Sequence, residues 1–247
     1  MLGKQSEKMI YFDNYADRYP RLVFQVEEGY ALKNKDDKYV PKAYICGIET
    51  FPSTMSVQPT FSHFGVNFTS FAPLEIFKTG EESLVNKIVD LTELGFNELV
   101  RKLTDALSHT QRIHVICNFI DQQLRYKTLL HPSIMQIVLE NELSEQTDLH
   151  HLHKKYKFSE RTMERLFKNT MGISPKTFQR LVRFEKTLAL LKDPSVKNTT
   201  TIGYMLNYND QSHFIKDFKS FSNITPFQFQ RNNFLLSESS AFISKVG

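Results

Sequence analysis

The 247-residue sequence predicts an α+β protein of two domains, in which a β-rich domain with following helices precedes an all-α domain made of two copies of one helical unit. Three observations predict this organisation. Short runs of β-branched and aromatic residues occupy the first part of the chain, apolar residues take a helical spacing from Gly80, and one pattern near the C-terminus occurs twice. The expected boundaries are 1–126 for the first domain, 127–145 for a helical linker, 146–234 for the second domain and 235–247 for a tail.

Three segments of the first domain predict antiparallel strands, because each is rich in β-branched and aromatic residues. They are RLVFQVEEGYALK at 21–33, KAYICGIET at 42–50 and SVQPTFSHFGVNFT at 56–69. The apolar residues that follow recur at helical spacing, which predicts two or three helices. Those residues are Leu84, Ile88 and Leu91, then Leu99, Leu103 and Leu107, then Ile113, Ile116 and Ile120. A connecting helix is expected to begin near Pro132, since proline suits a first helical turn.

The repeated pattern occupies 152–175 and 202–226. Each copy contains a short helix, a turn, a second helix with a polar start that ends in Phe-Lys, and a Ser-Pro or Thr-Pro dipeptide that starts a further helix. The hydroxyl groups of Ser174 and Thr225 can accept hydrogen bonds from the free amides of those further helices, and the proline after each suits the first helical position. The pattern therefore predicts two helix–turn–helix units, joined by a long amphipathic helix.

Charge is distributed unevenly along the chain. The net charge is +4, but residues 1–145 hold 15 Lys and Arg against 19 Asp and Glu, whereas residues 146–247 hold 16 against 8. The second part, with a balance of +8, is expected to attract polyanions, although a solvated basic surface has the same composition.

The second helix of each unit has one apolar and one polar face. Met163, Leu166 and Phe167 share a face in the first copy, and three phenylalanines from Phe214 to Phe221 do so in the second. A helix of this kind can dock on its own domain and present its polar face to the major groove of DNA, which is about 12 Å wide and admits one α-helix. Helical repeats with such a face are more often plain packing, but the paired turns, the duplicated caps and the basic balance favour DNA binding.

These residues resemble the DNA-binding domain of AraC/XylS-type transcriptional regulators over 148–231. The landmarks that carry the resemblance are Ser159, Leu166-Phe167-Lys168, Gly172, Ser174-Pro175, Ile202, Tyr208, Asp210-Gln211-Ser212, Phe214, Phe218-Lys219, Thr225-Pro226 and Arg231. The chain departs from the family pattern at His153, Lys157, Asn207 and Asn223. The resemblance implies a regulator that reads promoter DNA with two recognition helices in successive major grooves.

The resemblance also implies which side chains contact DNA. The base-contacting residues would be Arg161, Glu164, Arg165, Gln211, Ser212, His213, Ile215 and Lys216, and the phosphate-contacting residues Lys168, Thr200, Thr201 and Lys219. The chemistry agrees, because Arg165 can bind guanine bidentately, Gln211 can pair with adenine and Glu164 can accept from cytosine N4.

The first domain is similar, more weakly, to the small cupin-like sensor domain of one branch of these regulators. The segment YICGIETFPSTMSVQPTFSHFGVNFTSFAPLEIF carries this resemblance. The chain begins late relative to that branch, so the first strands of the barrel are expected to be missing or replaced. By analogy, the domain would bind a small effector, mediate homodimerisation or both, and RNA polymerase would be a further partner of an activator.

Enzyme chemistry is not expected. The sequence contains no Gly-rich phosphate loop and no serine nucleophile elbow. His150 and His153 share a helical face, but no further ligand stands at a supporting spacing, so neither a metal nor a cofactor is predicted. Cys46 and Cys117 are expected to be buried thiols.

No apolar run approaches the roughly 20 residues that span a bilayer, and the first residues do not read as a signal peptide, so a cytoplasmic protein without membrane partners is expected. Two rival interpretations stay open from the sequence. One is a helical interaction module that binds an acidic protein partner through the same basic face. The other is an enzyme built on the first domain.

Overall fold

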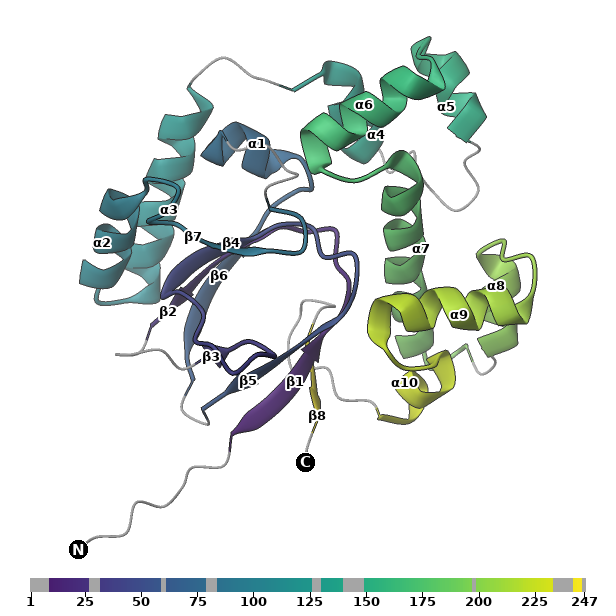
Figure 1. The fold of residues 1–247 in the computed structure, drawn as a ribbon, viewed down its shortest axis with the longest axis horizontal. Helices are drawn as coiled ribbons and strands as arrows, with labels where there is room; N and C mark the ends of the chain where they lie inside the picture. The colour runs from purple at the N-terminus through teal and green to yellow at the C-terminus, as the bar shows by residue number, and fades with distance from the viewer. Residues whose placement is uncertain are drawn as a thin grey trace, which may run out of the picture.

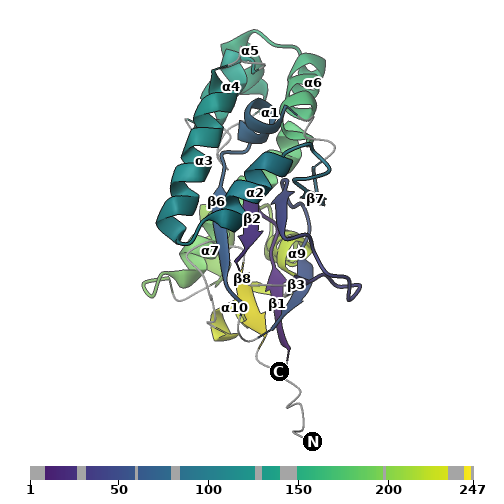
Figure 2. The ribbon, with the colours of Figure 1, turned by 90° about the vertical axis from the view of Figure 1, so that its left-hand side faces the viewer.

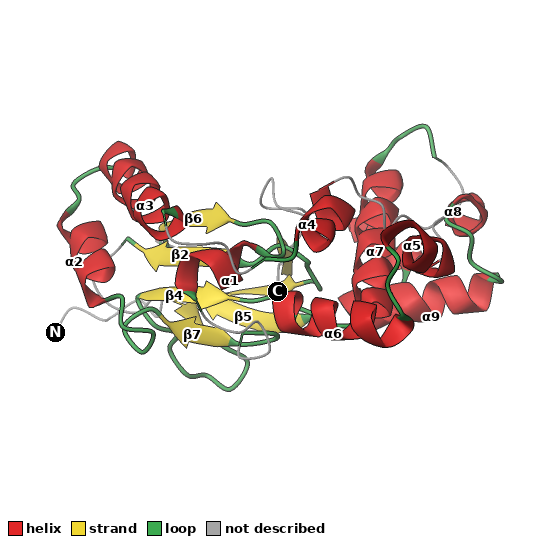
Figure 3. Cartoon of the chain, turned by 90° about the horizontal axis from the view of Figure 1, so that it is seen from above, coloured by secondary structure: helices red, strands yellow, loops and turns green. Residues whose placement is uncertain are grey.

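The computed structural model describes residues 9–26, 32–58, 61–78, 84–125, 130–139, 149–196, 199–232 and 242–245. Within these ranges a β-rich domain and a helical domain lie side by side, as Figures 1 and 3 show. None of the helices in these ranges combines the length and the hydropathy that a membrane-spanning segment needs.

The strands form two four-stranded sheets, with the orders β3-β5-β1-β8 and β6-β2-β4-β7, and neighbouring strands are antiparallel. Their bounds are β1 Ile10–Asn14, β2 Arg21–Gln25, β3 Leu32–Lys33, β4 Ala43–Cys46, β5 Ser53–Val57, β6 His63–Asn67, β7 Ile88–Asp90 and β8 Phe242–Lys245. Successive side chains of a strand point to opposite faces. Val23 of β2 therefore packs with residues of the other sheet, whereas Leu22 and Phe24 pack with helices.

Helices cover the outer face of the β6-β2-β4-β7 sheet. They are α1 (Ala72–Phe77), α2 (Asn97–Asp105) and α3 (His109–Leu124), and Figure 2 shows α2 and α3 in front of the strands. The apolar faces of α2 and α3 pack in one buried cluster with Leu22, Phe24 and Ile45. The predicted β-rich domain with following helices is therefore confirmed.

The structure differs from the prediction at Leu84, Ile88 and Leu91, whose spacing predicts a helix. The chain instead turns and forms β7, which pairs with β4. Leu84 and Leu91 are fully buried while Ile88 is 36% exposed, so the three do not share one face. Asn86, at a φ of +56°, breaks any helix between them. The helix prediction is wrong here, because β4 takes a further strand at its edge, but the two later helices are present.

The helical domain contains α4 (Pro132–Leu139), α5 (Leu149–Tyr156), α6 (Glu160–Met171), α7 (Pro175–Lys192), α8 (Thr199–Met205), α9 (Gln211–Ser222) and α10 (Pro226–Asn232). These helices share one hydrophobic core, in which Phe167, Phe178 and Phe214 are among the largest buried side chains. The connecting helix α4 begins at Pro132, as the sequence predicts, and its apolar side chains join this core.

The chain returns to the first domain at its C-terminal end. β8 pairs with β1, with Phe12 opposite Ser244, so a segment that follows the last helix completes the first sheet (Figure 1). Of the predicted tail 235–247 only Phe242–Lys245 lies within the described residues, and of the predicted linker 127–145 only 130–139 does. The domain boundaries stay a prediction.

The loop between β1 and β2 connects the two domains. The Tyr15 ring is buried between two phenylalanine rings, one from α7 and one from α10, at centroid distances of 6.2 Å. The Ala16 amide donates to the Phe221 carbonyl at 2.9 Å, and Arg18 Nε lies 2.7 Å from Glu185 Oε2. This loop therefore holds α7, α9 and α10 against the β-rich domain.

Candidate nucleic-acid interface

The two predicted helix–turn–helix units consist of α5 with α6 and of α8 with α9. Each turn contains one residue in the left-handed region, Lys157 in the first and Asn207 in the second, both at a φ of +55°. In both turns the next residue's amide donates to a carbonyl of the first helix, from Phe158 to His153 and from Tyr208 to Gly203, at 3.0 Å each. Asn tolerates this conformation better than Lys does, so the second turn carries less backbone strain.

Gly203 allows the helices of the second unit to approach closely. A Cβ atom at this position would lie 3.3 Å from Gln211 Oε1 and 3.6 Å from the Phe214 side chain. The corresponding residue of the first unit is His153, which is half-buried. The first unit therefore accommodates a bulky side chain at the place where the second unit needs a small one.

Side-chain caps define the N-termini of both second helices. The Ser159 hydroxyl accepts from the Thr162 amide at 3.2 Å, and the Asp210 carboxylate accepts from the His213 amide at 2.7 Å. Each helix ends at a residue in the left-handed region, Gly172 for α6 and Asn223 for α9. The helices that present the predicted base-contacting side chains thus begin and end at equivalent positions.

The Ser-Pro and Thr-Pro dipeptides start the next helices as predicted. The Ser174 hydroxyl accepts from the Thr177 amide at 3.0 Å, and the Thr225 hydroxyl accepts from the Gln228 amide at 3.2 Å. Pro175 is the first residue of α7 and Pro226 is the first residue of α10. The repeat seen in the sequence is therefore a repeat of capped helices.

The predicted DNA-contacting residues lie on the outward faces of α6, α8 and α9. Their apolar partners Met163, Phe167, Phe214, Phe218 and Phe221 are buried on the opposite faces. The exposed residues of the predicted set are Arg161, Glu164, Arg165, Lys168, Thr201, Ser212, His213, Ile215, Lys216 and Lys219, while Gln211 and Thr200 are half-buried. The fold thus makes both polar faces accessible, but which of these side chains touch DNA stays a prediction.

Basic side chains gather in an open hollow along α6. Its volume is about 520 Å³, and Arg161, Thr162, Arg165, Lys168 and Asn169 line it. The hollow brings together two predicted base-contacting cations and one predicted phosphate-contacting cation. None of the described residues that line the hollow is acidic, so its chemistry suits a polyanion.

The helix α7 separates the two recognition helices. With 18 residues it is about 27 Å long, given a rise of 1.5 Å per residue. Figure 1 shows α6 at the start of α7 and α9 further along it. The length of α7 is of the same order as the repeat of the major groove, which is about 34 Å.

A polar network that was not predicted from the sequence lies behind α9. Asp217 lies in the buried face of the helix, and its carboxylate accepts from Arg180 Nε at 2.8 Å and from the Tyr208 hydroxyl at 3.0 Å. Burial, with the nearby Asp217 carboxylate, raises the pKa of Tyr208 well above its usual range. The sequence does contain a signal for this network. Asp217 is an acidic residue at a position where the helical spacing of Phe214 and Phe218 predicts an apolar one.

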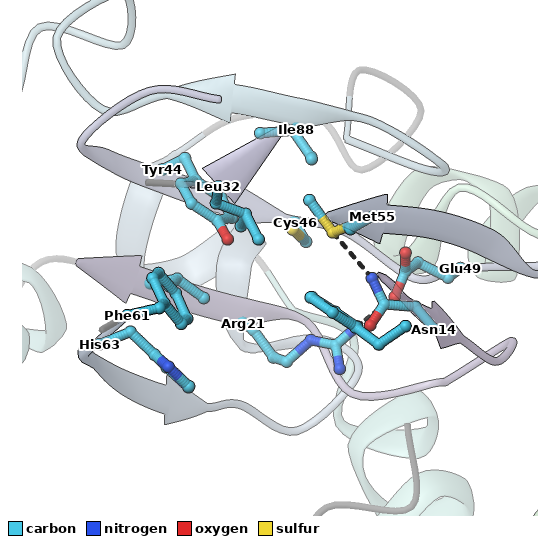
Figure 4. A pocket seen from close by; sticks show the side chains of 12 residues that line it. Asn14, Arg21, Leu32, Tyr44, Cys46, Glu49, Met55, Phe61, His63 and Ile88 are labelled. Carbon is cyan, nitrogen blue, oxygen red and sulfur yellow. Dashed lines mark hydrogen bonds and ion pairs between the residues drawn. The ribbon is translucent and has the colours of Figure 1, made fainter. Parts of the chain in front are cut away.

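The β-rich domain encloses a small cavity of about 40 Å³ between its sheets (Figure 4). Arg21 and Glu49 line it and form an ion pair, and Asn14 donates to the Met55 sulfur at 3.0 Å. Burial raises the pKa of the Glu49 carboxyl, although Arg21 opposes the effect. The cavity combines polar and apolar groups and is the candidate effector site of this domain.

The cysteines and histidines fit no metal centre in the described part of the chain. No group of three or more His, Cys, Asp and Glu side chains there has the geometry of a metal site. Cys46 is buried as predicted, and burial raises the pKa of its thiol to about 12. Cys117 is exposed, so its predicted burial is wrong, because it lies on the outward face of α3.

A domain with two capped recognition helices, exposed polar faces and a basic hollow belongs to the class of helix–turn–helix DNA-binding domains. Residues 152–232 match the family model described as a helix-turn-helix domain. The chain is similar to YdeC of Bacillus subtilis (strain 168), an uncharacterized HTH-type transcriptional regulator, with 23% identity over 230 residues that cover 84% of this chain and 74% of YdeC. It is also similar to an uncharacterized HTH-type transcriptional regulator of Haemophilus influenzae, with 24% identity over 138 residues that cover 53% of this chain and 46% of that protein.

Two solved structures are among those to which the chain is similar. ToxT from Vibrio cholerae has 11% identity and a TM-score of 0.48, with 91% of this chain and 94% of ToxT covered. The C-terminal domain of AraT, a response regulator from Geobacillus stearothermophilus, has 21% identity and a TM-score of 0.38, with 46% of this chain and 95% of that chain covered.

The matched residues 152–232 are a helix-turn-helix domain of the AraC type, and this confirms the resemblance predicted from the sequence. The chain is a DNA-binding transcriptional regulator with a β-rich N-terminal domain.

Proposed function

We propose that one chain reads two adjacent segments of promoter DNA, α6 in one major groove and α9 in the next. The observation that carries this proposal is the equivalence of the two units. Both have a left-handed turn residue, a side-chain N-cap, a buried aromatic face and an exposed polar face. Each copy thus has the size and the chemistry that a recognition helix in the major groove needs.

The exposed side chains divide by chemistry into two groups. Arg165, Glu164 and Gln211 have the donors and acceptors that match guanine, cytosine and adenine edges in the major groove. Lys168 and Lys219 stand in the last turns of α6 and α9, where a cation meets the phosphate backbone without reading sequence. The proposed interface therefore separates sequence readout from affinity.

The cavity of the β-rich domain is the proposed effector site. Its volume of about 40 Å³ has room for about three water molecules. We expect a larger effector to displace side chains that line the cavity. We propose in addition that this domain mediates homodimerisation, and that the protein contacts RNA polymerase if it is an activator.

Selection from a random duplex library with the full-length protein, at near-physiological salt, tests the proposed function. We expect an enriched motif with two blocks about one helical turn apart, which is about 10 base pairs. A palindromic arrangement would in addition report a homodimer. Absence of any enriched motif would contradict sequence-specific DNA binding and would favour the interaction module with an acidic protein partner.

A further inference from the structure

A buried carboxylate occupies the middle of the apolar face of α9. The residues of that face are Phe214, Asp217, Phe218 and Phe221, and the Asp217 side chain is 5% exposed. Burying a charge is costly unless it is paired, and an apolar side chain in the same place is often as stable or more stable. Packing alone therefore does not account for an aspartate here.

Three elements meet at this carboxylate. Asp217 Oδ1 accepts from Nε and Nη2 of Arg180 on α7, at 2.8 and 2.5 Å, and Oδ2 accepts from the Tyr208 hydroxyl in the turn, at 3.0 Å. Arg180 also donates to Ser220 Oγ at 3.2 Å. Its guanidinium group lies 4.7 Å from the centroid of the Phe221 ring. The turn, the recognition helix and the spacer helix are thus joined by directional bonds.

The first unit is built without such a network. The residues that correspond to Tyr208 and Asp217 are Phe158 and Leu166, and both pack against the hydrophobic core. A helix–turn–helix unit in this chain therefore folds with apolar side chains at these positions. Among the described residues of the two units, this network is present in the second unit.

The connections in the chain explain why the second unit differs. α6 ends at Met171 and α7 begins at Pro175, so a short link fixes the first recognition helix relative to the spacer helix. By contrast, α9 begins at Gln211, 19 residues after α7 ends at Lys192, and α8 lies between them. The placement of α9 on α7 therefore depends on side-chain contacts rather than on a short link.

Small movements of α9 matter for base readout. A helix with its side chains has a radius of about 5–6 Å, so a rotation of about 20° about its axis moves the outward side chains by about 2 Å. Hydrogen bonds to bases do not survive a displacement of that size.

We propose that Asp217 is a positioning residue. With Arg180 and Tyr208 it fixes the second recognition helix on the spacer helix, and so sets the spacing between the two DNA blocks that the protein reads. This inference rests on the proposed function, because it assumes that both helices read bases.

The test measures the spacing preference of full-length variants. The duplexes carry the two enriched blocks with the gap lengthened or shortened by one and by two base pairs. Each added base pair moves the blocks about 3.4 Å apart and rotates them by about 35°. The wild-type protein is expected to prefer one gap by about tenfold, which corresponds to the loss of one good base contact at the wrong gap.

Two variants remove the network in different ways. Asp217→Asn removes the charge at constant size, and the triple change Arg180→Met, Tyr208→Phe and Asp217→Leu replaces all three members by apolar side chains that can pack. Both are expected to enrich the same two blocks while the preference for one gap falls to less than about threefold. Thr187→Val is the matched control, because Thr187 is buried in the same core and, among the described residues, its hydroxyl donates to the Arg183 carbonyl of its own helix.

The outcomes separate this inference from the proposed function. If the wild type enriches two blocks and both variants keep its gap preference, with only a lower unfolding temperature, Asp217 has a structural role and the inference is wrong. If the wild type itself enriches no two-block motif, the proposed function fails and the inference fails with it. A broader gap preference in both variants, with Thr187→Val unchanged, supports the positioning role.

Discussion

The substitution Arg165→Ala separates base readout from folding in this protein. Arg165 is exposed on α6 and lines the basic hollow. None of the described residues forms a hydrogen bond or an ion pair with its guanidinium group. Its removal is therefore expected to change the free energy of unfolding by no more than about 0.5 kcal/mol, as for an ordinary surface site.

The loss should appear in specific DNA binding instead. A bidentate contact between an arginine and a guanine contributes about 1–3 kcal/mol, so the affinity for the selected duplex should fall by about 5- to 150-fold. At the same time, the variant should discriminate less between the four bases at one position of the duplex. Binding to random duplexes should change much less, because the other cations of the surface remain.

Lys219→Ala is the matched control. Lys219 is also an exposed cation, but it lies in the last turn of α9, where we propose a phosphate contact. Its removal should weaken binding to all sequences alike and lower the slope of log affinity against log salt by about 1. Fluorescence anisotropy titrations of both variants, on the selected and on random duplexes at several salt concentrations, measure these quantities. An equal loss for Arg165→Ala on both kinds of duplex would refute base readout by this residue.

Three further predictions concern the rest of the molecule. Tyr15→Ala removes a buried ring from the domain interface and should lower the free energy of unfolding by about 3–5 kcal/mol in denaturant titrations, whereas a surface position would leave it unchanged. Burial raises the pKa values of Asp17 and Glu49, so the folded state binds these two protons more tightly than the unfolded state does. The stability that this contributes should be complete below about pH 4 and should be lost as the pH rises through the raised pKa values. If the stability of Glu49→Gln followed the same pH dependence as the wild type, this expectation would be contradicted. Native protein should react with a thiol reagent at Cys117 and not at Cys46, and two labelled thiols without denaturant would contradict the burial of Cys46.

The helical domain could be predicted from the sequence because its signals are local. Ser159 and Ser174 are caps whose partners stand three residues away in the chain. The spacing of Phe214, Phe218 and Phe221 identifies the buried face of one helix without reference to any other element. Caps, turns and helical spacing together specified both units.

The parts that the sequence did not reveal depend on distant partners. Asp217 was not predicted as an inward residue, because its partner Arg180 is 37 positions away. The turn and strand at 84–91 were predicted as a helix, since the pairing of Ile88–Asp90 with β4 is not visible in the spacing of leucines and isoleucines. The same holds for β8, whose partner β1 lies at the opposite end of the chain.

The contact between the domains was not predicted either. Tyr15 lies in a short segment between two strands, and nothing in its neighbourhood in the sequence indicates burial against α7 and α10. Its role follows only from the assembled fold.

Methylation interference on the selected duplex tests the central claim most directly, because methylation at guanine N7 blocks contacts in the major groove. With full-length protein we predict two clusters of interfering guanines on one face of the duplex, about 10 base pairs apart. Arg165→Ala should remove interference from one cluster only. A single cluster, or two clusters on opposite faces, would contradict the claim that one chain reads two successive major grooves.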